Sequence, residues 1–340
     1  LVEYFRGNAK LLAEDGYFTD FISNGVSTEL CFVAFCAFTL IIIFAGVQNG
    51  IERVSKIMMP ILIVLSVIIA VYSVTRPGAL AGVKYFLVPN VKNFSWMTVV
   101  SAMGQMFYSL SIAMGILITF GSYMKKDTAI EDSTRNVEIF DTGIAIMAGL
   151  MIIPAVFAFS GGDPDTLQAG PSLMFITIPK VFQNMGFGTV IGIVFFLLVL
   201  FAAVTSSIAL TESAVSTFED ELGWGRKKAT VLVGVIMLAL GSLSSLGYGP
   251  LAGIKIIGMQ FLDLFDFLTN SVMMPIAALL TSLFVSRVVG IDKIEEEIIH
   301  GESAFRRKKV FVVMIKYLCP VFAIIILLSS VANALGWIKM

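Results

Sequence analysis

The chain has 340 residues, of which 57% are hydrophobic and 14% charged, and these proportions are typical of an integral membrane protein rather than a soluble domain. A formal net charge of −1 offers no basic field for nucleic acid, and one histidine with three cysteines supplies neither a disulfide framework nor a metal-ligand spacing. These features exclude nucleic-acid binding, zinc chemistry and thiol redox chemistry. The chain opens with Leu1, and its first thirty residues lack the apolar core of a signal peptide, so we expect that an N-terminal portion is missing.

Eight apolar runs are long enough to cross a bilayer, which takes roughly 20 helical residues. Charged residues gather between these runs, as expected where lipid forbids unpaired polarity. The predicted spans are 30–48, 54–75, 97–124, 137–160, 188–217, 229–247, 266–288 and 311–335.

The lysines and arginines predict the orientation of these spans, because they accumulate on the cytoplasmic side of short loops. One alternating set of loops holds 14 of the 23 basic residues, including those at 125–126, 226–228 and 306–309. This set is therefore predicted to be cytoplasmic, and residues 1–29 become an extracellular loop. The long loops 76–96 and 161–187 are also external, and act either as lids or as plain covers of the bundle; 171–183 has a helical pattern.

The third span contains a small and hydroxyl-rich stretch from Gly104 to Gly115. One interpretation is a break in the helix, where free carbonyls bind a cation and exposed N–H groups receive an anion such as a carboxylate. The alternative is a close helix–helix contact, which small residues also allow.

Asp141 in the fourth span is costly to ionise in the bilayer without a cation or a partner, and is the sharpest single indication of a functional site. The alternative is an acid at the membrane interface.

The fifth span carries Ala202, Thr205 and Ser206 on one helical face. Their hydroxyls and a freed carbonyl suit a hard cation such as Na⁺, although Ser and Thr also bond back to their own helix. One turn further, Glu212 could form a pair, line a cytoplasmic vestibule or lie at the interface, and we favour the vestibule.

Asp263 and Asp266 lie three residues apart at the outer end of the seventh span, facing the extracellular mouth. They either gate that mouth or stabilise the N-terminus of their helix, because a negative charge there interacts favourably with the helix dipole.

Several stretches resemble the neurotransmitter:sodium symporter family, whose members share the fold of the bacterial leucine transporter. They follow one another in the family's order over nearly the whole chain, and are Gly50-Ile51-Glu52-Arg53 with Lys56 to Pro60, Gly104 to Ser111, Thr119 to Tyr123, Ala202 to Ser207, and Glu219-Asp220-Glu221-Leu222.

The resemblance implies an all-α membrane protein, a helical bundle of the leucine transporter type. Eight spans would then be family helices four to eleven, with the first three missing. Residues 1–29 would be an external loop, 30–96 the last two helices of the first inverted repeat with an external loop, 97–289 the second repeat of five helices, and 290–340 a cytoplasmic loop with one more helix. The family's substrate and sodium sites lie between helices one, three, six and eight, so half of each would lie outside this chain.

By position, the resemblance also assigns site residues. The carbonyl of Ala202 with Thr205 and Ser206 would serve one sodium site, and Ser109 with Asp141 the other. The substrate pocket would be lined by Tyr108, Ser109, Ser111, Met114, Ser206 and Leu210. The external gate would hold Asp266 with Asp263 nearby, and the internal gate Asp220 with Tyr123 and Ser122.

Two departures from the family's common pattern bear on chloride and on the substrate. Asp141 stands where many members have asparagine, and Ala145 where chloride-dependent members have serine, close to the position implied for Gln105 beside chloride. The fixed carboxylate of Asp141 would supply the balancing negative charge that chloride supplies in other members. We therefore expect transport that is independent of chloride, and protonation of Asp141 would also allow proton countertransport. Ala113-Met114-Gly115 also departs from the family pattern and leaves the pocket volume open.

The resemblance thus predicts a Na⁺-coupled symporter of amino acids or related small solutes, working by alternating access. It would need no cofactor besides Na⁺ and would sit in a cell membrane, most simply a bacterial inner membrane. The alternative is a non-transporting membrane subunit or a channel component, but no filter-like repeat is visible. A membrane enzyme would lack material for a catalytic site, since the one histidine lies in a charged loop.

Overall fold

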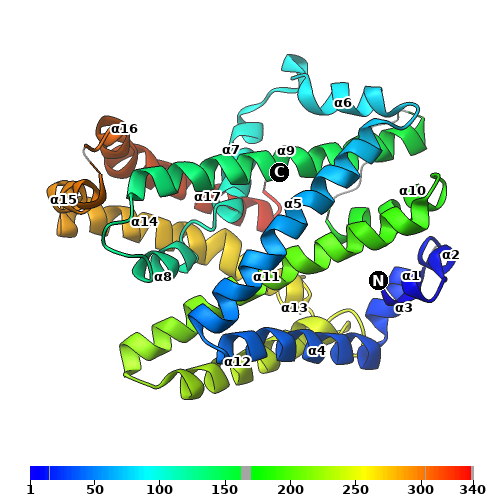
Figure 1. Ribbon diagram of the computed structural model, residues 1–340, viewed down its shortest axis with the longest axis horizontal. Helices are drawn as coiled ribbons and strands as arrows, with labels where there is room; N and C mark the ends of the chain where they lie inside the picture. The colour runs from blue at the N-terminus through cyan, green and yellow to red at the C-terminus, as the bar shows by residue number, and fades with distance from the viewer. Residues whose placement is uncertain (15, 162–169, 303, 338–340) are drawn as a thin grey trace. The chain divides into compact units, whose positions relative to one another are not determined.

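The structure is a computed structural model that describes residues 1–14, 16–161, 170–302 and 304–337 (Figure 1). Within these ranges the regular secondary structure is helical, apart from one isolated antiparallel bridge between Ile256 and Met259. Helices close every backbone hydrogen bond within one segment, which is what an apolar run in lipid requires.

Seven helical segments of the described residues are long and apolar enough to span a membrane. They confirm seven of the predicted spans, with ends that differ by a few residues because hydropathy marks the apolar run rather than the helix. They are α4 (Gly25–Phe44), η1–α5 (Val47–Val74), α9 (Ile130–Ser160), α11 (Gly188–Leu222), α12 (Arg226–Leu246), α13 to η6 (Phe261–Val289) and α16 to α17 (Lys308–Ala334).

The remaining predicted span, 97–124, forms two shorter helices, α7 (Trp96–Ser109) and α8 (Ile116–Ser122), in agreement with the interpretation that its helix is broken. The helix stops because the backbone between them enters the left-handed region.

Residues 1–14 and 16–29, predicted as part of an external loop, contain helices. They form α1 (Val2–Phe5), α2 (Ala9–Leu12), α3 (Tyr17–Ser23) and the start of α4. The Tyr4 ring is 3% exposed, and it lies so close to Gly192 of α11 that a Cβ there would sit 2.4 Å from it. Burial raises the pKa of Tyr4 to about 12.

The two predicted external loops also contain helices. α6 (Ala79–Leu87) and a short turn at Val91–Asn93 lie within 76–96. A π-helical turn (Leu173–Thr177) and α10 (Ile178–Gln183) confirm the helical pattern predicted for 171–183. Residues 162–169 of that loop lie outside the described residues.

The chain forms two compact units, each described here by itself. Unit 1 comprises Leu1–Val91, Thr142–Thr211 and Phe218–Ile254, and unit 2 comprises Lys92–Asp141, Glu212–Thr217 and Lys255–Met340. In unit 1, apolar side chains of α5, α10, α11 and the second half of α9 form a core that includes Ile69, Ala155, Ile178, Phe182 and Phe195.

Within unit 1, α4 and α12 run side by side (Figure 1). Glycines on α12 let the helices approach, since a Cβ at Gly241 would lie 2.1 Å from the Phe32 ring. At the start of α12, the Arg226 Nε donates to the Ile43 carbonyl at 2.9 Å, and the same guanidinium lies 3.5 Å from Glu219. Arg226 thereby satisfies a carbonyl at the end of α4.

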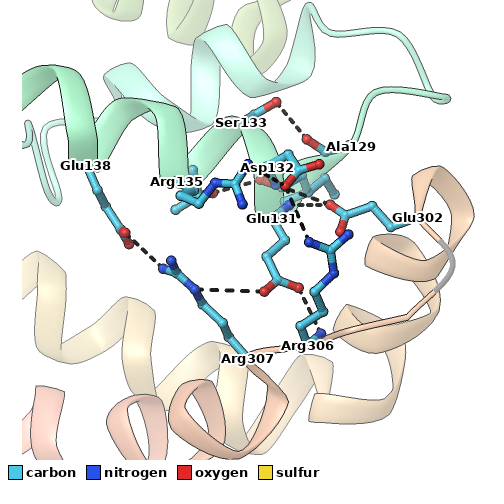
Figure 2. A network of polar contacts seen from close by, with 11 residues as sticks. Ala129, Glu131, Asp132, Ser133, Arg135, Glu138, Glu302, Arg306 and Arg307 are labelled. Atoms are coloured by element: carbon cyan, nitrogen blue, oxygen red, sulfur yellow. Dashed lines mark hydrogen bonds and ion pairs between the residues drawn. The ribbon is translucent and has the colours of Figure 1, made fainter.

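In unit 2, α14 (Met274–Phe284) packs on α17 (Cys319–Ala334), and α15 (Ile291–Gly301) precedes the connection to α16. That connection anchors the first turn of α9 (Figure 2). Glu302 Oε1 accepts the backbone N–H of Glu131 at 2.6 Å and that of Asp132 at 3.4 Å. Arg307 Nη1 donates to Glu138 Oε2 at 2.9 Å.

These contacts fix the start of the helix that carries Asp141. Glu302 satisfies two N–H groups that the first turn of any helix leaves without an intrahelical partner, and its charge suits the positive end of the helix dipole.

We therefore predict that Glu302→Ala lowers the thermal unfolding midpoint of the purified protein, since losing a helix cap costs about 1 kcal/mol. Glu302→Gln keeps an amide oxygen for the same N–H groups and should stay near the wild-type midpoint. The matched control is Glu297→Ala, at an exposed position of α15. Equal midpoints for Glu302→Ala and Glu297→Ala would show that the cap contributes nothing.

Candidate functional site

The interruption between α7 and α8 is the central feature of the candidate site. Ser111 and Ala113 have φ values of 54° and 64°, and Gly115, the residue before α8, has 77°. Residues other than glycine pay roughly 1–2 kcal/mol for this conformation, and strain of this kind gathers at functional sites. The structure thus supports the break in the helix over the alternative of a plain close contact.

A glycine is required at position 115 by the neighbouring side chains as well as by the positive φ of the backbone. A Cβ there would lie 2.6 Å from the Ser213 Oγ of α11. Ser213 also donates to the Met114 carbonyl at 3.4 Å and accepts from the Thr119 Oγ1 at 3.4 Å. Sequence reasoning missed Ser213, because nothing distinguishes it from the other small residues of α11.

At the last residue of α7, the Ser109 Oγ donates to Asp141 Oδ1 at 2.6 Å. The two residues are 32 positions apart, and the resemblance assigned them to the same sodium site. Asp141 is partly buried in α9, and as a carboxylate it has acceptor sites beyond the one that Ser109 uses. A carboxylate and a hydroxyl oxygen are ligands that suit a hard cation.

The hydroxyl cluster of α11 shows a different arrangement. The Thr205 Oγ1 donates back to the carbonyls of Ala202 at 3.0 Å and Phe201 at 3.1 Å, which is the local bonding that Thr commonly forms in helices. Ser206 is exposed, and its neighbour Ser207 shares a 3.1 Å hydrogen bond with Thr39 of α4. Ala202, Thr205 and Ser206 therefore lie together on unit 1, with the Ala202 carbonyl engaged by Thr205.

The residues predicted to line a substrate pocket divide between the units. Tyr108, Ser109, Ser111 and Met114 follow one another through the break in unit 2. Met114 packs against the buried cluster of Phe107, Met274 and Ile326, while Tyr108 is 53% exposed. Ser206 and Leu210 lie on α11 in unit 1, and Leu210 is 49% exposed.

A pocket of about 410 Å³ in unit 2 brings three predicted residues together. Gln105 and Tyr108 of α7 line it opposite Asp266 of α13 (Phe261–Asp266). Asp266 Oδ1 accepts from the Asn270 Nδ2 at 2.6 Å. Asp263 lies in the first turn of α13, where its charge suits the helix dipole.

The predicted cytoplasmic gate includes a contact that involves Glu212. Glu212 is fully buried, and its Oε1 accepts the Tyr123 hydroxyl at 2.7 Å. Ser122 Oγ donates to the Thr119 carbonyl at 2.7 Å, and Asp220 is exposed near the end of α11. Of the three roles considered for Glu212, the structure supports pairing, here with Tyr123. The burial of Glu212 could not be predicted from hydropathy, because a lone acid near a helix end is usually interpreted as interfacial.

Comparisons with known proteins agree with this geometry. The sequence model described as "Sodium:neurotransmitter symporter family" matches residues 2–337. The chain is 34% identical over 335 residues to the uncharacterized sodium-dependent transporter YhdH of Bacillus subtilis, covering 97% of this chain and 73% of that protein.

A second relative is the uncharacterized sodium-dependent transporter MJ1319 of Methanocaldococcus jannaschii. It is 30% identical over 264 residues, covering 76% of this chain and 52% of that protein. Among solved structures, MhsT in complex with L-phenylalanine matches with a TM-score of 0.83 and 33% identity, over 97% of this chain and 74% of that one.

These matches show a multi-pass membrane transporter, not an enzyme, with Na⁺ as its coupling ion. The chain belongs to the sodium:neurotransmitter symporter family.

Proposed function

We propose that this protein couples the inward movement of Na⁺ to the uptake of an amino acid or a related small solute, without needing chloride. The observation that carries the proposal is the contact between Ser109 and Asp141 at the break between α7 and α8. An interrupted helix in a membrane transporter exposes backbone groups for substrate and ion where a continuous helix would bond them internally.

The proposed sodium ligands are Ser109 and Asp141 at one site, and the Ala202 carbonyl, Thr205 and Ser206 at the other. For the second site, the Thr205 hydroxyl would keep donating to its own helix while its oxygen lone pairs face the ion. The substrate would lie against Tyr108, Ser109, Ser111, Met114, Ser206 and Leu210. The similarity to MhsT, solved with L-phenylalanine, supports an amino acid as the solute.

The charge of Asp141 supports chloride independence. A carboxylate held beside the ion supplies the negative charge that a bound chloride would supply, and Ala145, one turn along α9, offers no hydroxyl to a chloride. Gln105, one turn before Ser109 on α7, would face the same region.

Gating is proposed at both ends. Asp266, with Asp263 nearby, would close the external side, and the pocket that Asp266 shares with Gln105 and Tyr108 supports this. Tyr123, Ser122 and Asp220 would close the cytoplasmic side, where the hydrogen bond from Tyr123 to the buried Glu212 supports such a role. In family terms, α7 and α8 together would be the sixth helix and α11 the eighth, with 97–289 forming the second inverted repeat.

The proposal is tested by uptake of a panel of labelled amino acids into proteoliposomes that hold the full-length protein. We expect uptake that needs an inward Na⁺ gradient and is equal in chloride and in gluconate. Absence of Na⁺-driven uptake for every amino acid would contradict the amino acid assignment, and a requirement for chloride would contradict the role of Asp141.

The role of Asp141 predicts the behaviour of Asp141→Asn. Without chloride, uptake should fall at least about tenfold, because the lost charge contributes on the order of 1.4 kcal/mol or more to ion binding. Added chloride should restore part of the uptake by Asp141→Asn.

Glu138→Gln is the matched control for this variant, since it removes a like charge three residues earlier on α9, where Glu138 contacts Arg307. It should transport like the wild type. An Asp141→Asn protein that works fully without chloride would refute the assignment.

The second sodium site predicts that Thr205→Val raises the Na⁺ concentration for half-maximal uptake about tenfold, which is the scale expected for losing one oxygen ligand. Thr217→Val is the control, because Thr217 also donates back to its own helix, at 2.8 Å to the Ser213 carbonyl. The same Na⁺ dependence in both variants would mean that the Thr205 hydroxyl is only structural.

A further inference from the structure

A carboxylate outside the sites proposed above lies in a membrane span of unit 1. Glu29 is the fifth residue of α4, about 6 Å along the helix axis from Gly25. Hydropathy placed it at the end of an external loop, but the helix starts earlier because Asn24 caps it, accepting the Ser27 N–H at 3.2 Å. By the distribution of basic residues, this end of α4 is the external one, so Glu29 lies at the level of the outer headgroups.

Both oxygens of Glu29 accept hydroxyls from the end of α12. The Ser242 Oγ donates to Oε1 at 2.5 Å, and the Ser245 Oγ donates to Oε2. Among the described residues these two neutral groups are the partners of the carboxylate. A carboxylate has about four acceptor sites, so about two stay open, and no ion pair within the described part of the chain balances the negative charge.

The open side of Glu29 faces a groove of about 600 Å³, lined on α4 by Val26, Leu30 and Val33 and on the other side by Leu246 and Pro250. Val26 and Leu30 are 80% and 70% exposed. On a membrane helix such side chains contact acyl chains. The groove therefore combines one anionic group at headgroup level with an apolar wall below it.

We propose that this groove binds a phospholipid of the outer leaflet whose headgroup ends in a primary ammonium. The ammonium donates to the open acceptor sites of Glu29, and an acyl chain lies along Leu30 and Val33, which follow Glu29 toward the bilayer interior. A primary ammonium has three N–H donors, whereas the quaternary ammonium of a choline headgroup has none, and a glycerol headgroup carries no positive charge. The site is independent of the substrate and sodium residues proposed above.

The test is native mass spectrometry of the full-length protein titrated with phosphatidylethanolamine, phosphatidylcholine and phosphatidylglycerol of identical acyl chains. We expect the wild type to prefer phosphatidylethanolamine about tenfold, the scale of one charge-assisted hydrogen bond. Glu29→Gln should lose this preference. Glu52→Gln, which removes a carboxylate paired with Lys56 near the start of the next span, should keep this preference.

Val33→Lys gives a second route that leaves Glu29 and its serines in place. A lysine four residues after a glutamate lies on the same helical face, and its side chain points back toward the helix start. Its ammonium should form an ion pair with the Glu29 carboxylate and abolish the preference for phosphatidylethanolamine, while the protein folds normally.

The proposal is overturned if the wild type binds the three lipids equally, or if Val33→Lys keeps the preference for phosphatidylethanolamine. A folded Glu29→Gln protein that keeps it would overturn the proposal equally.

Discussion

The requirement that every backbone hydrogen bond in a bilayer be satisfied governs this structure. Seven helical segments of the described chain are long and apolar enough to span a membrane, and the helix from Trp96 to Ser122 is interrupted between Ser109 and Ile116. An interruption is tolerated at membrane depth only where protein or a water-filled cavity surrounds it. At this interruption the Ser109 hydroxyl donates to the Asp141 carboxylate.

Three carboxylates inside the spans accept hydrogen bonds from hydroxyl groups. Asp141 accepts from Ser109, Glu212 from Tyr123, and Glu29 from Ser242 and Ser245. Hydroxyl donors satisfy a carboxylate's hydrogen bonding without neutralising its charge. Such a group keeps its attraction for a cation, which is the property that a coupling-ion site needs and that an internal ion pair would remove.

Hydropathy was enough to predict seven of the spans, because those follow from the apolar runs themselves. The break in α7 and α8 was predictable only as one of two interpretations, since small residues serve both. The Thr205 hydroxyl bonds its own helix, as the plainer interpretation held. The burial of Glu212, the cap by Glu302 and the position of Glu29 in α4 depend on contacts between distant segments, which local sequence patterns do not encode.

The central claim is that Ser109 and Asp141 bind one sodium ion together. The most direct measurement is a double-mutant cycle on equilibrium binding of radiolabelled Na⁺, using Ser109→Ala, Asp141→Asn and the double variant. If the two side chains act on one ion, their losses are not additive, and the double variant binds about as weakly as Asp141→Asn alone. Fully additive losses, or Na⁺ binding unchanged in Asp141→Asn, would contradict the account.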